Sequence, residues 1–428
     1  MKKKGIIIFF FLLITHSCAY FDEDEQILPG KRQSVFKFED DIILKSNERI
    51  NIDKSISVDS WSQQFQNERN HLFHFKSKTK LSLKKKIKLN DIAFDKIDHI
   101  TTPVFDLKNV YYADNDFNVY STSLENGKIN WIVKLVNEKD ENLPFIGGFS
   151  LHKNELFITS GLGNIYSVNA ENGKVLWKKK LLVQFSRPPL VFKNKIIVVS
   201  DDNQTFALNT KDGNLMWSHI GNIEEVSIIG GSKPVVTENI VIVSYSSGEI
   251  YALDHNDGTL IWFDNITSGN FFSKSSLNDI QSPISIVGDK LFVPSFSDKF
   301  IAYEISNGNK VWNLKLSSIN PFVVSGGSIY LIDTLGRLLC IDKINGKLLW
   351  AVQLRVSNDG EEISWYGPLL SSNKLILNNS DGQVISISPF TGKLLSKIRF
   401  YEELVSNPIN IGDQIILISK KGTLFILG

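Results

Sequence analysis

One motif recurs seven times along this chain: an apolar stretch, a polar turn containing glycine, and a second apolar stretch. Six copies end in tryptophan, as in VYSTSLENGKINW (119–131) and IYALDHNDGTLIW (250–262). A glycine stands four residues before each tryptophan, and the seventh copy, VISISPFTGKLLS (384–396), keeps Gly392 but ends in Ser396. Successive tryptophans are 38 to 50 residues apart, which is a period typical of repeat architectures.

Each copy predicts an antiparallel hairpin, because glycine beside asparagine or aspartate accepts the positive φ of a tight turn. The tryptophan stands at a fixed point on the second strand, where its large apolar surface can pack between neighbouring sheets. Further strand-like stretches, such as KNKIIVVS (193–200), separate the copies. Four strands in roughly 40–45 residues are typical of one blade of a β-propeller.

The number of blades follows from the two ends of the repeat region. After the seventh copy, QIILISKKGTLFILG (414–428) supplies strands of an eighth unit but no tryptophan-bearing strand. An uncovered sheet edge invites aggregation, so another segment should cover it. The alternating stretch LKKKIKL (83–89) suits that role. We therefore expect an all-β protein over 81–428, an eight-bladed β-propeller of four-stranded antiparallel blades closed by an N-terminal strand.

The first residues have the pattern of an export signal. Lysines at 2–4 precede nine apolar residues at 6–14, too few to span a bilayer as a helix. A signal peptide over 1–17 would leave Cys18 for lipidation, although the positions before Cys18 fit a lipidation signal imperfectly and cleavage after Ala19 is the alternative. The polar, irregular segment 18–80 is expected to be a tether with short local structure.

Composition excludes several classes of protein. The chain has 47 Lys and Arg against 46 Asp and Glu, so nothing indicates nucleic-acid binding. Two cysteines are too few for a disulfide framework, and Cys340 lies in an apolar run typical of a small buried residue. His71 and His74 lack the neighbours that a metal site needs. The sequence DNDFN (114–118) resembles the start of a calcium loop but is interpreted as a hairpin turn.

The repeats resemble the PQQ-type propeller repeat, best seen in ALDHNDGTLIW (252–262), and the chain as a whole is similar to the BamB family of outer-membrane lipoproteins. The stretches that carry this likeness are LPGKR (28–32), PVFDLKNVYYAD (103–114), RPPLVFKNKIIVVS (187–200), SINPFVVSGGSIYLID (318–333) and SNPINIGDQIILISKKGTLFIL (406–427). The resemblance implies a lipid-anchored scaffold on the periplasmic face of the outer membrane. Such a scaffold has no enzymatic activity and no cofactor, and it binds the periplasmic domains of BamA within the BAM complex.

Binding by a propeller usually falls to the loops between strands. Two long connections are successive: Trp217 to Pro234 is 17 residues, and Trp262 to Pro283 is 21. The first contains three apolar residues and the second three polar ones, which gives the predicted partner-binding set Val226, Ile228, Ile229, Asn278, Asp279 and Gln281. The apolar three would alternatively belong to the first strand of the next blade, and the polar three to an ordinary turn.

The resemblance bears on these two connections, since the family uses them to contact BamA. Val226 and Ile228 fall where the family has leucines, whereas Ile229 replaces an arginine of some members. Asp279 matches a family aspartate if a one-residue gap is allowed, and Gln281 replaces another. Two other functions stay open: a PQQ-dependent dehydrogenase, which a quinone titration would reveal, and a propeller for another envelope partner or a polysaccharide, which a pull-down would distinguish.

Overall fold

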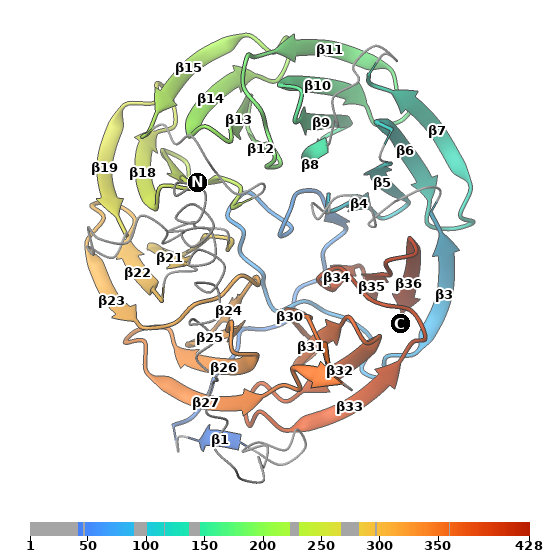
Figure 1. Ribbon diagram of the computed structural model, residues 1–428, viewed down its shortest axis with the longest axis vertical. Helices are drawn as coiled ribbons and strands as arrows, with labels where there is room; N and C mark the ends of the chain where they lie inside the picture. The colour runs from blue at the N-terminus through green and yellow to red at the C-terminus, as the bar shows by residue number, and fades with distance from the viewer. Residues whose placement is uncertain are drawn as a thin grey trace, which may run out of the picture. The chain divides into compact units, whose positions relative to one another are not determined.

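Eight four-stranded antiparallel sheets, the blades, follow one another around a ring in the described part of the chain (Figure 1). The computed structural model describes residues 42–45, 48–89, 101–114, 116–136, 146–222, 231–266, 282–295, 298–358 and 360–428. All of them lie in one compact unit that spans 38–428. The prediction of an all-β, eight-bladed propeller is confirmed.

The blades are numbered 1 to 8 in the order in which the chain builds them, and each is given from the inside of the ring outward. Blade 1 contains β4 (Val104–Asp106), β5 (Asn109–Ala113), β6 (Asn118–Ser123) and β7 (Ile129–Lys134), and blade 2 contains β8 (Ile146–His152), β9 (Glu155–Ser160), β10 (Asn164–Asn169) and β11 (Val175–Lys180). Blade 3 contains β12 (Leu190–Phe192), β13 (Lys195–Val199), β14 (Gln204–Asn209) and β15 (Leu215–Ile220), and blade 4 contains β16 (Val235–Val236), β17 (Ile240–Ser244), β18 (Glu249–Asp254) and β19 (Leu260–Asn265).

Blade 5 contains β20 (Ser285–Val287), β21 (Lys290–Pro294), β22 (Phe300–Glu304) and β23 (Lys310–Leu314), and blade 6 contains β24 (Val323–Ser325), β25 (Ser328–Ile332), β26 (Arg337–Asp342) and β27 (Leu348–Gln353). Blade 7 contains β30 (Trp365–Ser371), β31 (Lys374–Asn379), β32 (Gln383–Ile387) and β33 (Leu394–Arg399), and blade 8 contains β34 (Ile409–Ile411), β35 (Gln414–Ile418), β36 (Thr423–Leu427) and β3 (Leu83–Lys88). Four short strands lie outside this scheme: β1 (Ile42–Lys45), β2 (Ser60–Trp61), β28 (Ser357–Asn358) and β29 (Glu361–Glu362).

The ring is closed by β3, as the sequence predicts. It pairs antiparallel with β36, from Leu83 opposite Leu427 to Lys88 opposite Thr423. The outermost strand of the last blade therefore comes from the start of the propeller, and in Figure 1 the blue β3 lies against the red β36. This pairing covers the edge of β36 that would otherwise be open.

Tryptophans join successive blades. Trp217 of blade 3 lies opposite Ala207 in its own sheet, and its Nε1–H donates to the carbonyl of His255 in blade 4 at 3.2 Å. The glycine of the next repeat, Gly258, has a φ of +77°, and a Cβ there would lie 2.6 Å from the Trp217 ring. The other five repeat tryptophans donate in the same way: Trp131 to Ala170, Trp177 to Thr210, Trp262 to Ile305, Trp312 to Lys343 and Trp350 to Pro389.

Residues 56–78, which we call the belt, run around the inside of the ring and hydrogen-bond to every blade in turn. An inner strand has an unpaired backbone edge, and the belt supplies the missing partners. In the order of blades 1 to 8 the contacts are Trp61 with Phe105, Ser62 with Leu151, Gln63 with Val191, Glu68 with Val236, Arg69 with Ile286, Leu72 with Val323, Phe75 with Leu370 and Lys78 with Asp413.

The belt also closes on itself and enters the core. The N–H of Ile56 donates to the carbonyl of His74 at 2.8 Å, so the two ends of the belt overlap after one circuit. The apolar side chains of Trp61, Leu72 and Phe75 are buried in the largest hydrophobic cluster. Residues 56–78, which the sequence assigns to the tether 18–80, thus pack along the inside of the ring through buried apolar side chains and backbone hydrogen bonds.

Within the described ranges, no helix has the length and apolar character needed to cross a membrane.

Candidate binding face

The predicted functional residues lie outside the described residues. This applies to the lipidation candidate and to the partner-binding set: Cys18, Val226, Ile228, Ile229, Asn278, Asp279 and Gln281. The structure does describe the residues on both sides of the two predicted connections, and these show how the ring holds them. The innermost strands that follow the connections are β16 and β20.

A buried carboxylate holds the start of the first connection. Glu249 is 1% exposed, and its Oε2 accepts a hydrogen bond from the backbone N–H of Asn222 at 3.0 Å. The side-chain amide of Asn222 donates to the other oxygen of Glu249. Gly221 donates its N–H to Asn203 and packs against the ring of Tyr245. The last residues before the predicted loop are thus fixed to blades 3 and 4.

A buried lysine holds the end of the same connection. Lys233 is fully buried, and its Nζ donates to the backbone carbonyl of Asn67 at 3.0 Å and to Oε1 of Gln63 at 3.3 Å. Burial lowers the pKa of Lys233 to about 7, an effect that the nearby Glu68 partly opposes. The belt therefore supplies the acceptors that make burial of this ammonium group tolerable.

One belt side chain links the ends of both connections. The amide nitrogen of Asn70 donates to the carbonyl of Ile284 at 3.0 Å and reaches the carbonyl of Lys233 at 3.5 Å. The hydroxyl of Ser232 accepts the N–H of Ile284 at 3.0 Å. Lys233 follows the first predicted connection and Ile284 follows the second, so the residues at which the chain re-enters the two blades are cross-linked.

Aromatic rings of blades 3 and 4 pack together beside Gly221. The ring centroid of Tyr251 lies 4.4 Å from that of His219 and 4.8 Å from that of Phe263. The ring centroid of Tyr245 lies 5.4 Å from that of Tyr251. The hydroxyl of Tyr245 lies 2.7 Å from that of Thr205. Burial lowers the pKa of His219, while Glu249 acts in the opposite direction. This aromatic cluster joins blades 3 and 4 close to the residues that precede the first connection.

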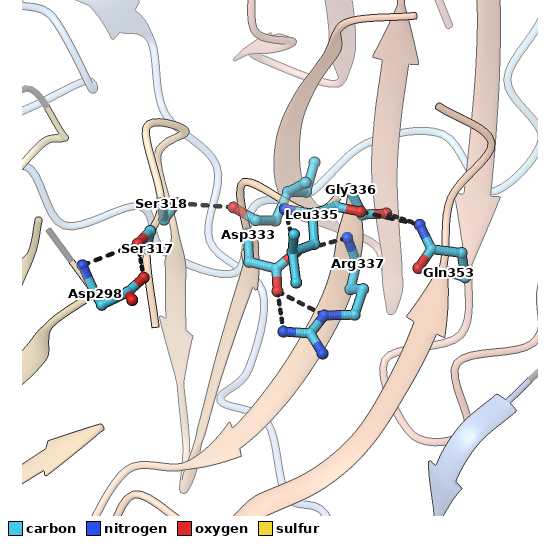
Figure 2. A network of polar contacts seen from close by, with 9 residues as sticks. Asp298, Ser317, Ser318, Asp333, Leu335, Gly336, Arg337 and Gln353 are labelled. Atoms are coloured by element: carbon cyan, nitrogen blue, oxygen red, sulfur yellow. Dashed lines mark hydrogen bonds and ion pairs between the residues drawn. The ribbon is translucent and has the colours of Figure 1, made fainter. Parts of the chain in front are cut away.

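Figure 2 shows the turn between β25 and β26 of blade 6, which is held by side-chain hydrogen bonds. The carboxylate of Asp333 accepts the N–H of Leu335 at 3.1 Å and pairs with the guanidinium of Arg337 at 2.5 Å. The amide of Gln353 donates to the carbonyls of Leu335 and Gly336. The backbone of this turn is held from both sides, and the side chain of Leu335 stays exposed at its tip.

Two interpretations of single residues are confirmed. Cys340 is a free, fully buried thiol, and burial raises its pKa to about 12. The carboxylate of Asp114 accepts hydrogen bonds from the N–H groups of Asp116 and Asn118, from the side chain of Asn118 and from the hydroxyl of Tyr120. The DNDFN stretch is therefore a turn held by its own first aspartate.

The two histidines that lie close in the sequence, His71 and His74, have backbone partners. His71 Nε2 lies 3.0 Å from the carbonyl of Val324, and His74 contacts the carbonyl of Asp53 through Nδ1 and the N–H of Asn373 through Nε2. Both rings help to fix the belt to blades 6 and 7. In the described part of the chain, no group of three or more His, Cys, Asp or Glu side chains could hold a metal ion.

Sequence reasoning missed Gln63, Asn67, Asn70 and Lys233, whose hydrogen bonds fix the residues that follow the two predicted connections. The segment QQFQNERN (63–70) is polar without a strand or helix period, so it suggested a tether. A signal was present in the apolar residues Trp61, Leu72 and Phe75 on either side of it. Apolar residues placed around a short polar stretch favour a buried segment over a solvated one.

The closed ring, the tryptophan–glycine contacts and the repeat hairpins define the class of PQQ-repeat-like β-propellers. A family model described as Outer membrane protein assembly factor BamB matches residues 115–352, which is 238 of the 428 residues. The chain therefore belongs to the BamB family.

Individual relatives are distant. Outer membrane protein assembly factor BamB of Moranella endobia is 23% identical over 277 residues, 64% of this chain and 70% of that protein. The BamB of Shewanella oneidensis is 27% identical over 164 residues, 38% of this chain, and the match spans only 40% of that protein's length.

Solved structures show the same fold. The crystal structure of BamB from Moraxella catarrhalis superposes with a TM-score of 0.67 at 17% identity, over 81% of this chain and 99% of that one. A quinohemoprotein alcohol dehydrogenase from Comamonas testosteroni gives a TM-score of 0.68 at 13% identity, over 86% of this chain and 80% of that one. At these identities the likeness establishes the propeller and nothing about its chemistry.

Proposed function

We propose that this chain is a scaffold lipoprotein of the BAM complex that binds the periplasmic domains of BamA and aids the insertion of outer-membrane proteins. Its role is not enzymatic, and it uses no cofactor. Lipid on Cys18 anchors it to the periplasmic face of the outer membrane. The contact residues are those that the sequence predicts: Val226, Ile228, Ile229, Asn278, Asp279 and Gln281.

The cross-link through Asn70 is the observation that best supports a shared binding face. Lys233 and Ile284 follow the two predicted connections, and the same side chain contacts both carbonyls. Interfaces gain affinity when their segments are ordered before the partner arrives, because less conformational entropy is lost on binding. A belt that fixes the bases of two connections provides such order.

An affinity pull-down from solubilised envelopes tests this proposal. The tagged chain should recover BamA as a major partner, and a variant that carries Ile228→Asp should lose it. Leu395→Asp serves as a matched control, because Leu395 is also an exposed aliphatic residue but lies on β33, away from the two connections. Recovery of another envelope protein without BamA would contradict the assignment.

The absence of a redox role is tested separately. Purified native protein should show no quinone absorbance, and added quinone should leave its melting temperature unchanged. A quinone band, or stabilisation by quinone, would favour the dehydrogenase alternative instead.

A further inference from the structure

The junction between blade 8 and blade 1 is built differently from the six that contain a repeat tryptophan. On β3, Lys85 stands opposite Ile426, the ladder position that Trp217 occupies opposite Ala207 in blade 3. Lys85 also takes over the hydrogen bond of the indole. Its Nζ donates to the carbonyl of Leu124 at 3.2 Å, three residues before the repeat glycine of blade 1.

An isoleucine takes the place of the indole ring against the repeat glycine. Ile87 provides the contact with Gly127, where a Cβ would lie 3.3 Å from the isoleucine Cγ2. Moreover, the outer hairpin of blade 8 is made from two separate segments, β36 and β3, so it has no continuous glycine turn. A lysine, an isoleucine and two strand ends stand where other blades have a tryptophan and a turn.

A cavity of about 800 Å³ lies at this junction and opens to solvent. Ile411, Ile416 and Ile426 of blade 8 line it with Leu124 of blade 1, which makes one side apolar. Its volume is in the range of pockets that bind small molecules. In Figure 1, β3 beside this junction lies on the opposite side of the ring from β19.

The polar lining of the cavity carries an excess of positive charge. Three lysines, Lys84, Lys85 and Lys108, face two carboxylates, Glu125 and Asp413. Asp413 is already neutralised, because it forms a 2.6 Å ion pair with Lys78 of the belt. An ammonium group has three donors, and Lys85 donates to the carbonyls of Leu124 and Glu125.

We propose that this cavity is a binding site for an aromatic anion, a flat apolar ring that carries a carboxylate or a similar negative group. The ring would lie against the isoleucines and Leu124. The negative group would pair with Lys85 and with the rim lysines Lys84 and Lys108.

Calorimetric titration of the full chain with three indole ligands tests the charge and the shape together. Indole-3-propionate should bind, its neutral amide should bind at least tenfold more weakly, and the cation tryptamine should bind least. Equal affinity for the three ligands would overturn the proposal, as would no binding of indole-3-propionate at millimolar concentration.

Two variants of Lys85 locate the site. Lys85→Trp restores the repeat residue, so it should fill the cavity and abolish binding, with a melting temperature equal to or above that of the parent. Lys85→Met keeps the space but removes the charge, so the affinity for indole-3-propionate should fall to that of the amide. Lys174→Met, on the exposed turn of blade 2, is the matched control and should change nothing. Unaltered binding by Lys85→Trp would overturn the proposal.

One further titration separates two sources of the same chemistry. The peptide acetyl-Glu-Trp-Glu-amide presents an indole between carboxylates as an extended protein segment would. Tighter binding of the peptide than of indole-3-propionate would identify an acidic aromatic segment as the ligand. Weaker binding would identify a free aromatic acid. Either result supports the site only if Lys85→Trp abolishes the binding of that ligand.

Discussion

Replacing Gly258 by alanine should destabilise the ring far more than the same change at Gly288. Both glycines have a positive φ, +77° and +64°, so both alanines incur the left-handed backbone penalty of about 1–2 kcal/mol. At Gly258 the new Cβ would lie 2.6 Å from the ring of Trp217, whereas at Gly288 nothing lies within 4 Å. Gly288→Ala is therefore a matched control for backbone conformation.

The additional cost at Gly258 comes from the contact between blades. Displacing a well-packed side chain typically costs about 1–3 kcal/mol. Moving the indole also weakens the hydrogen bond from Trp217 to the carbonyl of His255, worth about 1 kcal/mol. We expect Gly258→Ala to lower the free energy of unfolding by about 2–4 kcal/mol more than Gly288→Ala.

Urea unfolding followed by circular dichroism gives the comparison, with the slope of the transition checked in each variant. A double-mutant cycle isolates the cause: in a Trp217→Ala background, Gly258→Ala should cost no more than Gly288→Ala. Equal midpoints for the two alanine variants in the parent protein would refute the idea that tryptophan–glycine contacts hold the blades together.

Three other perturbations have defined outcomes. Deleting residues 81–90 removes β3 and leaves β36 without its partner, so the melting temperature should fall; an unchanged value would mean that the ring closes elsewhere. Burial lowers the pKa of His255 to about 4, below the 6.5 of an unfolded chain, so this group makes the folded protein less stable as the pH drops from 6.5 towards 4. His255→Phe should reduce that dependence of stability on pH, and an unchanged pH profile would contradict the assignment. Cys18→Ala should release the protein from the membrane fraction, and wild-type protein that is already soluble would favour cleavage after Ala19.

The repeat architecture was predictable because its signal is local. Each hairpin is encoded by about thirteen consecutive residues, and Gly258 or Trp217 has the same role wherever the motif recurs. The closing strand was predictable for a related reason. Seven complete copies and one incomplete unit left a single strand to be found, and the alternating pattern at 83–89 fitted it.

The belt was not predictable from the same signals. Its residues contact eight different blades, so each short stretch of the belt has its own environment and no period develops. Lys233 is a clear example, because nothing near it in the sequence shows that Gln63 and Asn67 will accept its hydrogen bonds. The missing tryptophan on β3 was visible in the sequence, but the cavity beside Lys85 appears only once blade 1 is in place.

The affinity of the purified chain for the periplasmic domains of BamA tests the central claim most directly. Measured by biolayer interferometry, the wild-type chain should bind, and Ile228→Asp should weaken binding by about 2–4 kcal/mol, since a charge would enter apolar surface that must lose its water. The melting temperature of the variant should stay that of the wild type. No binding by the wild-type chain, or undiminished binding by Ile228→Asp, would contradict the account. A collapsed melting curve would place Ile228 in the core of the next blade.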